Sequence, residues 1–543
     1  MITKIFKLNY KLLVISTLFL IGILIYSNTF YSSFHLDDSR SIVDNSAIRN
    51  ILNLQAIWNF WPTRFITYFS VALNYHLSQL NVFSYHLFNS LAHISTAIMV
   101  WWFMLLILST PAMKGEKIAK YANLIAFFAG LVFLTHPIQS QGVTYIIQRS
   151  VSLTTLFYLI CLSLYVKSRL LQQQGGSSVA SKIFYCWSLA AVVMAMFTKE
   201  IAITLPFMVL LVELCFLKTK ERLNWKNLLP FFMSLLIIPF TMLLTKSVDF
   251  IGMRRTLEQP SNISCLQYLF TQFRVIVTYL RLIFIPIHQN LDYDYHIAKS
   301  LLELPVLASF ILLVSILTAA IRIFSKYRLI SFGIFWFLLT LLPESSIITI
   351  KDVIFEHRLY LPMVGFSFFL VGIIYYILED KPLKFMITLL IIVSSCYAIL
   401  TYKRNFVWKD ELSLWNDTLH KSPKKTRPYN IRGIAYVRQG NLLQAISDYN
   451  KAIGINPKYA EAYSNRGNAY ALQGNLLQAI SDYNKAIEIN PKYAEAYRNR
   501  GAVYYAIKEF DKAWVDVHVT EGLGYAVDPN FLIELKKALG REK

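Results

Sequence analysis

The sequence predicts an all-α protein: a polytopic helical membrane bundle of about eleven spans, followed by a C-terminal α-solenoid of repeated helix pairs. Hydrophobic residues make up 55% of the 543 residues and charged residues only 16%, well below the roughly 25% of an ordinary soluble domain. Long apolar runs recur as far as residue 401, and a repeat of 34 residues follows them. We therefore expect two domains, residues 1–402 and residues 403–543.

The apolar runs come close to the length of about 20 residues that a helix needs to cross the hydrocarbon core of a membrane. They centre on residues 12–29, 86–109, 121–135, 143–166, 182–198, 200–217, 228–245, 303–324, 329–343, 360–378 and 383–401. Basic residues precede the first run, but no small-residue cleavage site follows it. We expect an uncleaved first span and not a removed signal peptide.

Basic residues in alternate loops predict which way the bundle faces, because cytoplasmic loops carry an excess of Lys and Arg. If residue 1 is cytoplasmic, every second loop is basic. These loops hold Lys114, Lys117 and Lys120; Lys167, Arg169 and Lys182; Lys218, Lys220, Arg222 and Lys226; Arg322, Lys326 and Arg328; and Lys381 and Lys384. The residues after 402 are then expected on the extracytoplasmic side.

This alternation requires that the apolar residues 267–285 do not cross the membrane. The segment carries Arg274 and Arg281 seven residues apart, which is about two helical turns and puts both on one face. We favour an amphipathic helix in the membrane interface over a twelfth span.

The net charge of 53 − 32 = +21 would suggest a nucleic-acid partner in a soluble protein. Here much of the surplus lies in the predicted cytoplasmic loops, where it sets orientation. We expect membrane lipid around the bundle and no nucleic-acid partner.

The C-terminal repeat is visible at three sets of positions: Gly433, Gly467 and Gly501; Ala445, Ala479 and Ala513; and Pro423, Pro457 and Pro491. The segment QGNLLQAISDYNKAI occurs twice, at residues 439 and 473. A period of 34 with Gly, Ala, Tyr and Pro at fixed offsets is the tetratricopeptide pattern. We expect about three repeats, preceded by a half-repeat over residues 403–425.

Ionisable residues on the predicted outer side are candidates for a functional site. Asp37 and Asp38 follow the first span directly, where nearby lipid favours a raised pKa in one of them. The alternative for the pair is a solvated loop end or a helix cap. The other outward clusters are His136, Arg149, Lys199 with Glu200, and Glu356 with His357 and Arg358. Each alone could be a snorkelling side chain or a helix end, but their gathering at one membrane face favours an enzyme over an ion-coupled transporter.

Several segments, taken in order, resemble one known family. They are FHLDDSRSIVDNSAI, RFITYFSVALNYHL, NVFSYHLFNSLAH, HPIQSQGVTYIIQRSVSLTTLFYL, TKEIAITLPFMVLLVEL, LPESSIITIKDVIFEHRLYLP and RNFVWKDELSLWNDTLHKSP. Together they resemble the transmembrane O-mannosyltransferases that carry tetratricopeptide repeats (the TMTC group) and their bacterial relatives. These belong to the GT-C glycosyltransferases, which take sugar from a polyprenyl-phosphate carrier on the extracytoplasmic face.

The resemblance implies an inverting transfer of a mannose-like sugar from a polyprenyl phosphate to a hydroxyl, with protein Ser or Thr as the expected acceptor. A lipid phosphate leaves as a stable anion, so the reaction needs one base and cations to hold the phosphate, but no general acid. The base is assigned to Asp37 or Asp38, with Asp37 preferred because the first acid of the family's pair is usually the catalytic one.

Phosphate binding is expected from Arg358 first, since a guanidinium offers two aligned donors, and then from His357, Arg149 and Lys199. Glu356, Glu200, Arg64 and His136 are expected to orient these groups. We expect no cofactor and no metal site, although a divalent cation stays open because acids cluster here. The repeats are expected to present a groove for an acceptor peptide or, alternatively, to serve in assembly.

Two further interpretations stay open: the same chemistry on a lipid or surface-polysaccharide acceptor, and a non-catalytic membrane scaffold. We expect a bacterial inner membrane with the repeats in the periplasm, or the ER-lumen side in a eukaryote.

Overall fold

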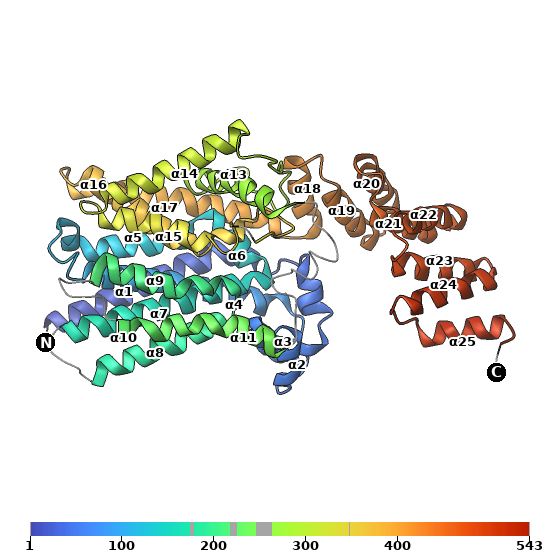
Figure 1. Ribbon diagram of the computed structural model, residues 1–543, viewed down its shortest axis with the longest axis horizontal. Helices are drawn as coiled ribbons and strands as arrows, with labels where there is room; N and C mark the ends of the chain where they lie inside the picture. Colours follow the sequence, from blue (N-terminus) through green and yellow to red (C-terminus); the bar gives the residue numbers. More distant parts are fainter. Residues whose placement is uncertain (1, 174–178, 218–224, 246–262, 347, 542–543) are drawn as a thin grey trace. The chain divides into compact units, whose positions relative to one another are not determined.

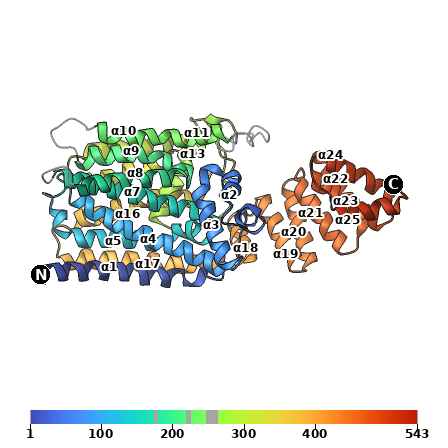
Figure 2. The same cartoon turned by 90° about the horizontal axis from the view of Figure 1, so that it is seen from below.

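The computed structural model describes residues 2–173, 179–217, 225–245, 263–346 and 348–541. It divides into two compact units, Met1–Gln289 with Tyr295–Asp410, and Asn290–Asp294 with Glu411–Lys543. The described residues contain helices and no strand, so the predicted all-α class is confirmed. In the first unit the long helices lie side by side with their axes roughly aligned (Figures 1 and 2).

The bundle contains helices at all eleven predicted places. Its elements are α1 (Ile2–Tyr26), α2 (Leu54–Phe60), α3 (Phe65–Ser78), α4 (Val82–Leu108), α5 (Ala122–Thr135), α6 (Ser140–Thr144), α7 (Arg149–Gln173), α8 (Val179–Met196), α9 (Leu205–Val212), α10 (Trp225–Met233), α11 (Ile237–Leu244), α13 (Cys265–Phe284), α14 (Leu304–Ile323), α15 (Arg328–Leu341), α16 (Pro362–Leu378) and α17 (Leu383–Asn405). Within the described residues, nine helical stretches are long and apolar enough to cross a membrane, and α15 and α16 are shorter apolar helices. The chain is a multi-pass membrane protein.

The two short helices pack against each other through glycine. A Cβ atom on Gly333 would lie 2.5 Å from the carbonyl oxygen of Gly365, and one on Gly365 would lie 2.6 Å from that of Gly333. Trp336 of α15 donates its indole N–H to the carbonyl of Leu361 at 2.9 Å. Small residues of this kind let helices approach closely where no hydrophobic driving force acts between them.

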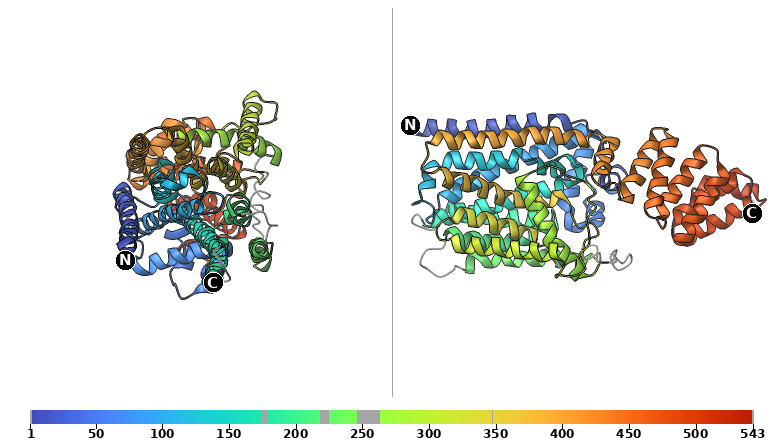
Figure 3. Two further views of the ribbon diagram at one scale, coloured as in Figure 1. Left: turned by 90° about the vertical axis from the view of Figure 1, so that its left-hand side faces the viewer. Right: turned by 90° about the horizontal axis from the view of Figure 1, so that it is seen from above.

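Helix α13 covers the segment whose crossing was in question. Its buried residues recur every three or four positions, and Arg281 is exposed. Among the described residues it does not reach the hydropathy of the nine membrane-length stretches, which agrees with an amphipathic helix. On the other side of the bundle, α1 and α17 run alongside each other, blue and orange in Figure 3.

The second unit is a stack of helix pairs: α18 (Glu411–Lys421), α19 (Thr426–Arg438), α20 (Leu442–Ile455), α21 (Ala460–Leu472), α22 (Leu476–Ile489), α23 (Ala494–Ala506), α24 (Phe510–Gly522) and α25 (Pro529–Ala538). At two of the repeated glycines, Gly433 and Gly467, an aromatic ring covers the backbone: a Cβ on Gly467 would lie 2.8 Å from the ring of Tyr483. The predicted repeat architecture is confirmed.

An ion pair recurs with the same period and joins three helices each time. In the middle repeat, Arg466 of α21 forms two hydrogen bonds with Asp482 of α22, at 2.7 and 2.8 Å, and donates to Asn450 of the preceding repeat. Arg432 with Asp448 and Asn416, and Arg500 with Asp516 and Asn484, repeat this arrangement. Asn416 lies on α18, within the half-repeat predicted over residues 403–425. Helix α18 therefore gives Arg432 the partner that a preceding repeat gives the other two arginines.

The close contact at Gly467 predicts the effect of adding one methyl group. Gly467→Ala is expected to destabilise the second unit by about 1–3 kcal/mol, because the new Cβ overpacks the Tyr483 ring. Gly454→Ala is the matched control: Gly454 also lies in a helix, but nothing lies within 4 Å of its Cβ position. It should be neutral or stabilise by up to about 1 kcal/mol.

The measurement is hydrogen–deuterium exchange of α21 and α22 in the detergent-solubilised full chain. Faster exchange in Gly467→Ala alone is the expected result. Equal exchange in the two variants would show that the Gly–Tyr contact does not limit the packing.

Candidate functional site

The acidic pair lies in the loop after α1, at the end of the bundle opposite the N-terminus, near α2 and α3 (Figures 1 and 2). The two acids occupy different surroundings. Asp38 is fully buried, and its carboxylate accepts hydrogen bonds from the backbone N–H of His35 at 3.0 Å and of Ile147 at 2.9 Å. Burial raises the pKa of Asp38 to about 7. Asp37 is exposed.

The backbone of this loop is fixed from several sides. Leu36 has a φ of +47°, a left-handed conformation that a branched side chain seldom adopts. The N–H of Asp37 donates to the hydroxyl of Tyr145 at 2.9 Å, and Tyr145 stacks on Trp408 with ring centroids 5.8 Å apart. Asp38 therefore anchors the loop, and Asp37 is the carboxylate presented to solvent.

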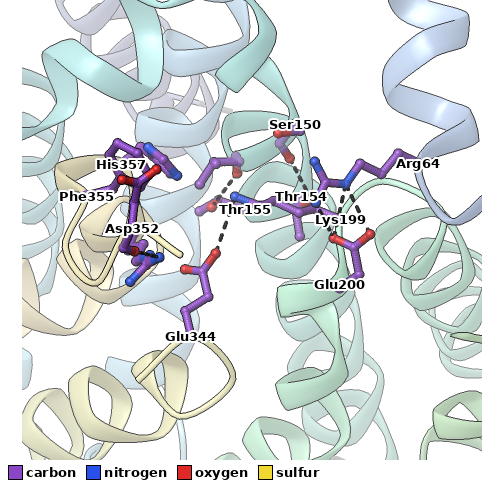
Figure 4. A network of polar contacts seen from close by, with 12 residues as sticks. Arg64, Ser150, Thr154, Thr155, Lys199, Glu200, Glu344, Asp352, Phe355 and His357 are labelled. Atoms are coloured by element: carbon purple, nitrogen blue, oxygen red, sulfur yellow. Dashed lines mark hydrogen bonds and ion pairs between the residues drawn. The ribbon is translucent and has the colours of Figure 1, made fainter. Parts of the chain in front are cut away.

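A cluster of charged side chains, drawn in Figure 4, gathers residues from four separate segments. Its first part is an ion pair between Arg64, at the end of a short turn (Pro62–Arg64) before α3, and Glu200, which begins the turn Glu200–Thr204 before α9. The guanidinium meets both carboxylate oxygens at 2.8–3.1 Å, and the Thr63 hydroxyl donates to the same carboxylate at 2.9 Å. The Glu200 carboxylate therefore balances the positive charge of Arg64.

The second part of the cluster is Lys199, whose side chain extends away from the Arg64–Glu200 pair toward Glu344 (Figure 4). The ammonium nitrogen lies 3.5 Å from the Glu344 carboxylate, longer than a good charge-assisted hydrogen bond. The Lys199 side chain is only 6% exposed, against 17% for Glu344. Burial lowers the pKa of Lys199, while Glu344 acts in the opposite direction.

The third part is the turn Glu356–Leu359, which precedes α16. Arg358 donates from Nη1 to the carbonyl of Val353 at 3.0 Å and from Nη2 to that of Asp352 at 2.8 Å. These contacts hold the turn in place. The positively charged guanidinium of Arg358 thus also stabilises the backbone of the segment that precedes it. The geometry therefore favours Lys199 over Arg358 as the cation that is more available to an anion.

His357 completes this group. Its backbone N–H donates to the side chain of Gln141 at 2.7 Å, and its ring stacks on Phe355. Burial and the nearby charges of Lys199, Arg358 and Arg64 lower the pKa of His357 well below its usual value. The imidazole is therefore neutral near pH 7. Glu356 is buried and accepts a hydrogen bond from Gln289 at 3.4 Å.

The acidic loop and the cation cluster share a neighbour in Tyr68 of α3. Its hydroxyl bonds to Ser41 at 3.3 Å, and its ring lies within electrostatic range of both Asp37 and Arg64. Residues far apart in sequence thus converge on one end of the bundle.

Two of the sequence-predicted residues make their hydrogen bonds away from the charged cluster. Arg149 is fully buried against α3 and α4, donating to Ser70 and Asn74 and covering the ring of Phe88. His136 contacts the carbonyl of Ile283 at 2.9 Å and accepts from the N–H of Ile138. Their polar contacts join helices to one another and are not directed at the cluster.

Glu344 is the residue that sequence reasoning missed. It lies in the segment LPESSIITIKDVIFEHRLYLP, after α15, but no spacing pairs it with Lys199. Its carbonyl accepts a hydrogen bond from Tyr268 of α13 at 2.8 Å. Among the described residues, no group of three or more His, Cys, Asp or Glu side chains could hold a metal ion.

The surroundings of Asp38 predict how stability depends on pH. The carboxyl binds its proton more tightly in the folded protein, where its pKa is about 7, than in the unfolded chain, where it is 3.8. The stability from this group is present below about pH 4 and is lost as the pH rises through about 7. In Asp38→Asn, the decline of the thermal midpoint between pH 5 and pH 7.5 should become shallower, measured on the detergent-solubilised protein. An unchanged slope would contradict the raised pKa.

Comparisons with known proteins agree with both units. The family model "TPR repeat" matches residues 433–474 and 467–508. The O-mannosyl-transferase F38B6.6 of Caenorhabditis elegans is 24% identical over 76% of this chain and 58% of its own length, and Tmtc3 of Drosophila melanogaster is 23% identical over 78% and 53%. The chain thus spans a little over half the length of these curated relatives.

Solved structures are similar at a lower level. ArnT from Cupriavidus metallidurans, bound to undecaprenyl phosphate, has a TM-score of 0.40 and 14% identity, covering 89% of this chain and 80% of that one. The first repeat domain of human RPAP3 has a TM-score of 0.21 and 28% identity, covering 22% and 96%. We draw nothing from similarity at these scores. The sequence relatives, by contrast, confirm the resemblance of this chain to the transmembrane O-mannosyltransferases that carry tetratricopeptide repeats.

Proposed function

We propose that this protein is a glycosyltransferase that moves a sugar from a polyprenyl-phosphate carrier to a hydroxyl acceptor on the extracytoplasmic face. The observation that carries the proposal is the presence of an exposed carboxylate, Asp37, and of the cations Arg64, Lys199 and Arg358 at the same end of a membrane bundle. The names of the sequence relatives, protein O-mannosyl-transferases, support this chemistry and favour a mannose-like sugar on protein Ser or Thr.

In the proposed reaction, Asp37 accepts the proton of the acceptor hydroxyl as its oxygen attacks the anomeric carbon of the sugar. The bond from that carbon to the phosphate oxygen breaks, and its electron pair stays on the phosphate. Attack opposite the leaving group inverts the anomeric configuration. The new negative charge forms on a phosphate held by fixed cations, the kind of preorganised stabilisation that lowers a barrier most in a water-poor site.

Lys199 is the first candidate for holding the phosphate, with Arg358 and the neutral imidazole of His357 beside it. Lys199 has three donors, and its ion pair with Glu344 at 3.5 Å leaves donors for an entering phosphate. Glu200 orients Arg64 through its two-point pair. The charge distribution of the loops supports an extracytoplasmic site, and the repeats offer a surface for an acceptor polypeptide.

Asp37→Asn tests the base. Its turnover should fall by about 10²–10⁴-fold, because an amide cannot accept the proton, while the thermal midpoint stays near that of the wild type, since Asp37 is exposed. The assay combines purified protein in nanodiscs with undecaprenyl-phosphate-linked mannose and a Ser/Thr-containing peptide, and follows release of the lipid phosphate.

Asp44→Asn is the matched control, because Asp44 is also an exposed carboxylate in the same loop. It should keep wild-type turnover. Equal release of lipid phosphate by Asp37→Asn and by the wild type would contradict the assignment of Asp37 as the base. If the wild type shows no turnover with several sugars and with both peptide and lipid acceptors, the proposed glycosyltransferase activity is overturned.

A further inference from the structure

Glu344 stands out among the acids of the cluster because it is held by its backbone and not by its carboxylate. The Tyr268 hydroxyl fixes its carbonyl at 2.8 Å. Its carboxylate meets Lys199 at 3.5 Å, whereas Glu200 is held at two points by Arg64. The side chain also lies within electrostatic range of Arg64 and of Arg358. One carboxylate therefore acts on three cations.

The formal charge of the cluster depends on this residue. Arg64 and Lys199 contribute +2 and their carboxylate partners Glu200 and Glu344 contribute −2, so these two ion pairs are balanced. His357 adds no charge while its imidazole is neutral. Without Glu344 the same two pairs would carry +1, and Lys199 would lose its ion-pair partner.

The lipid substrate and product of the proposed reaction differ in charge by one unit. The donor is a phosphodiester, which carries one negative charge at any pH near neutral. The product is a phosphomonoester, whose second ionisation has a pKa of about 6, so that it carries close to two negative charges above pH 7. A phosphate bound at Lys199 lies beside the Glu344 carboxylate, which repels the doubly charged product about twice as strongly as it repels the singly charged donor.

We propose that Glu344 is a specificity-determining residue that makes the phosphate site prefer the monoanionic donor and expel the dianionic product. This inference rests on the proposed function and extends it from transfer to product release. The Glu344 carboxylate also lies 3.5 Å from Lys199, which keeps the buried ammonium paired.

The test is a binding experiment that needs no turnover. Undecaprenyl phosphate represents the product, and its methyl phosphodiester represents the charge of the donor. Affinities of both lipids are measured at pH 7.5 for the full-length protein in nanodiscs. Glu344→Gln should bind undecaprenyl phosphate about tenfold or more tightly than the wild type does, because a nearby repulsive charge is gone, while its affinity for the diester changes much less.

Two variants separate charge from structure. Glu344→Asp keeps the charge and should keep the wild-type ratio of the two affinities. Glu379→Gln removes an exposed carboxylate at the C-terminal end of α16 and should also leave the ratio unchanged. Repeating the measurement at pH 5.5, where the monoester carries close to one charge, should shrink the difference between Glu344→Gln and the wild type. A merely structural role would not follow the ionisation of the ligand.

The outcomes distinguish this inference from the function beneath it. If the wild type binds both lipids and Glu344→Gln leaves their affinity ratio unchanged, the role of Glu344 is wrong and the proposed function stands. If the wild type binds neither lipid, both are overturned.

Discussion

The two-point ion pair between Arg64 and Glu200 joins segments that lie 136 residues apart in the chain, and the arrangement of the charged cluster depends on it. An ionised group taken out of water must find a counter-charge, since the loss of hydration otherwise costs several kcal/mol. The pair meets that requirement and at the same time fixes the start of α3 against the start of α9. Because Arg64 holds Glu200, the position of the preceding residue, Lys199, is fixed as well.

The same constraint explains why the charges gather at the ends of the bundle. Within the membrane-length helices, the buried polar side chains mostly bond to backbone carbonyls within the same helix, as Thr96 and Thr154 do. Two charges that lie on membrane-length stretches, Arg169 and Glu213, are paired at 2.7 Å, and the buried Arg149 is held by polar groups of α3 and α4. The charges are therefore concentrated where segments from several helices meet, which is also where the proposed reaction places the lipid phosphate.

Much of the fold was predictable from one-dimensional patterns. Apolar runs of sufficient length became the helices, and the 34-residue period became the helix pairs, because both signals are local. The division of the chain was placed at residue 402, whereas the two units divide at Asp410 and the second also takes in Asn290–Asp294. That short segment belongs to the second unit through contacts such as Asp292 with Arg427 at 2.7 Å, which no local pattern encodes.

The candidate site was predictable in part. Arg64, Lys199, Glu200, His357 and Arg358 converge as the sequence suggested. The sequence alone could not show which of Asp37 and Asp38 is exposed, because that difference is created by contacts with distant residues such as Tyr145 and Ile147. Arg149 and His136 carry suitable chemistry but face helix contacts, and Glu344 meets its partner only through the fold. The role of each side chain therefore depends on neighbours that are distant in sequence.

The recurring Arg–Asp–Asn contact has a consequence for how the second unit can change its length. Each guanidinium spans its own helix pair and the pair before it, so every internal unit offers the same connection at both ends. The series stops where Glu534 stands in place of the next arginine, on α25. A segment of 34 residues could be duplicated or deleted within the series without exposing an unmatched charge. The reach of the array can thus change by whole units while its internal chemistry stays constant, a freedom that the irregular bundle does not have.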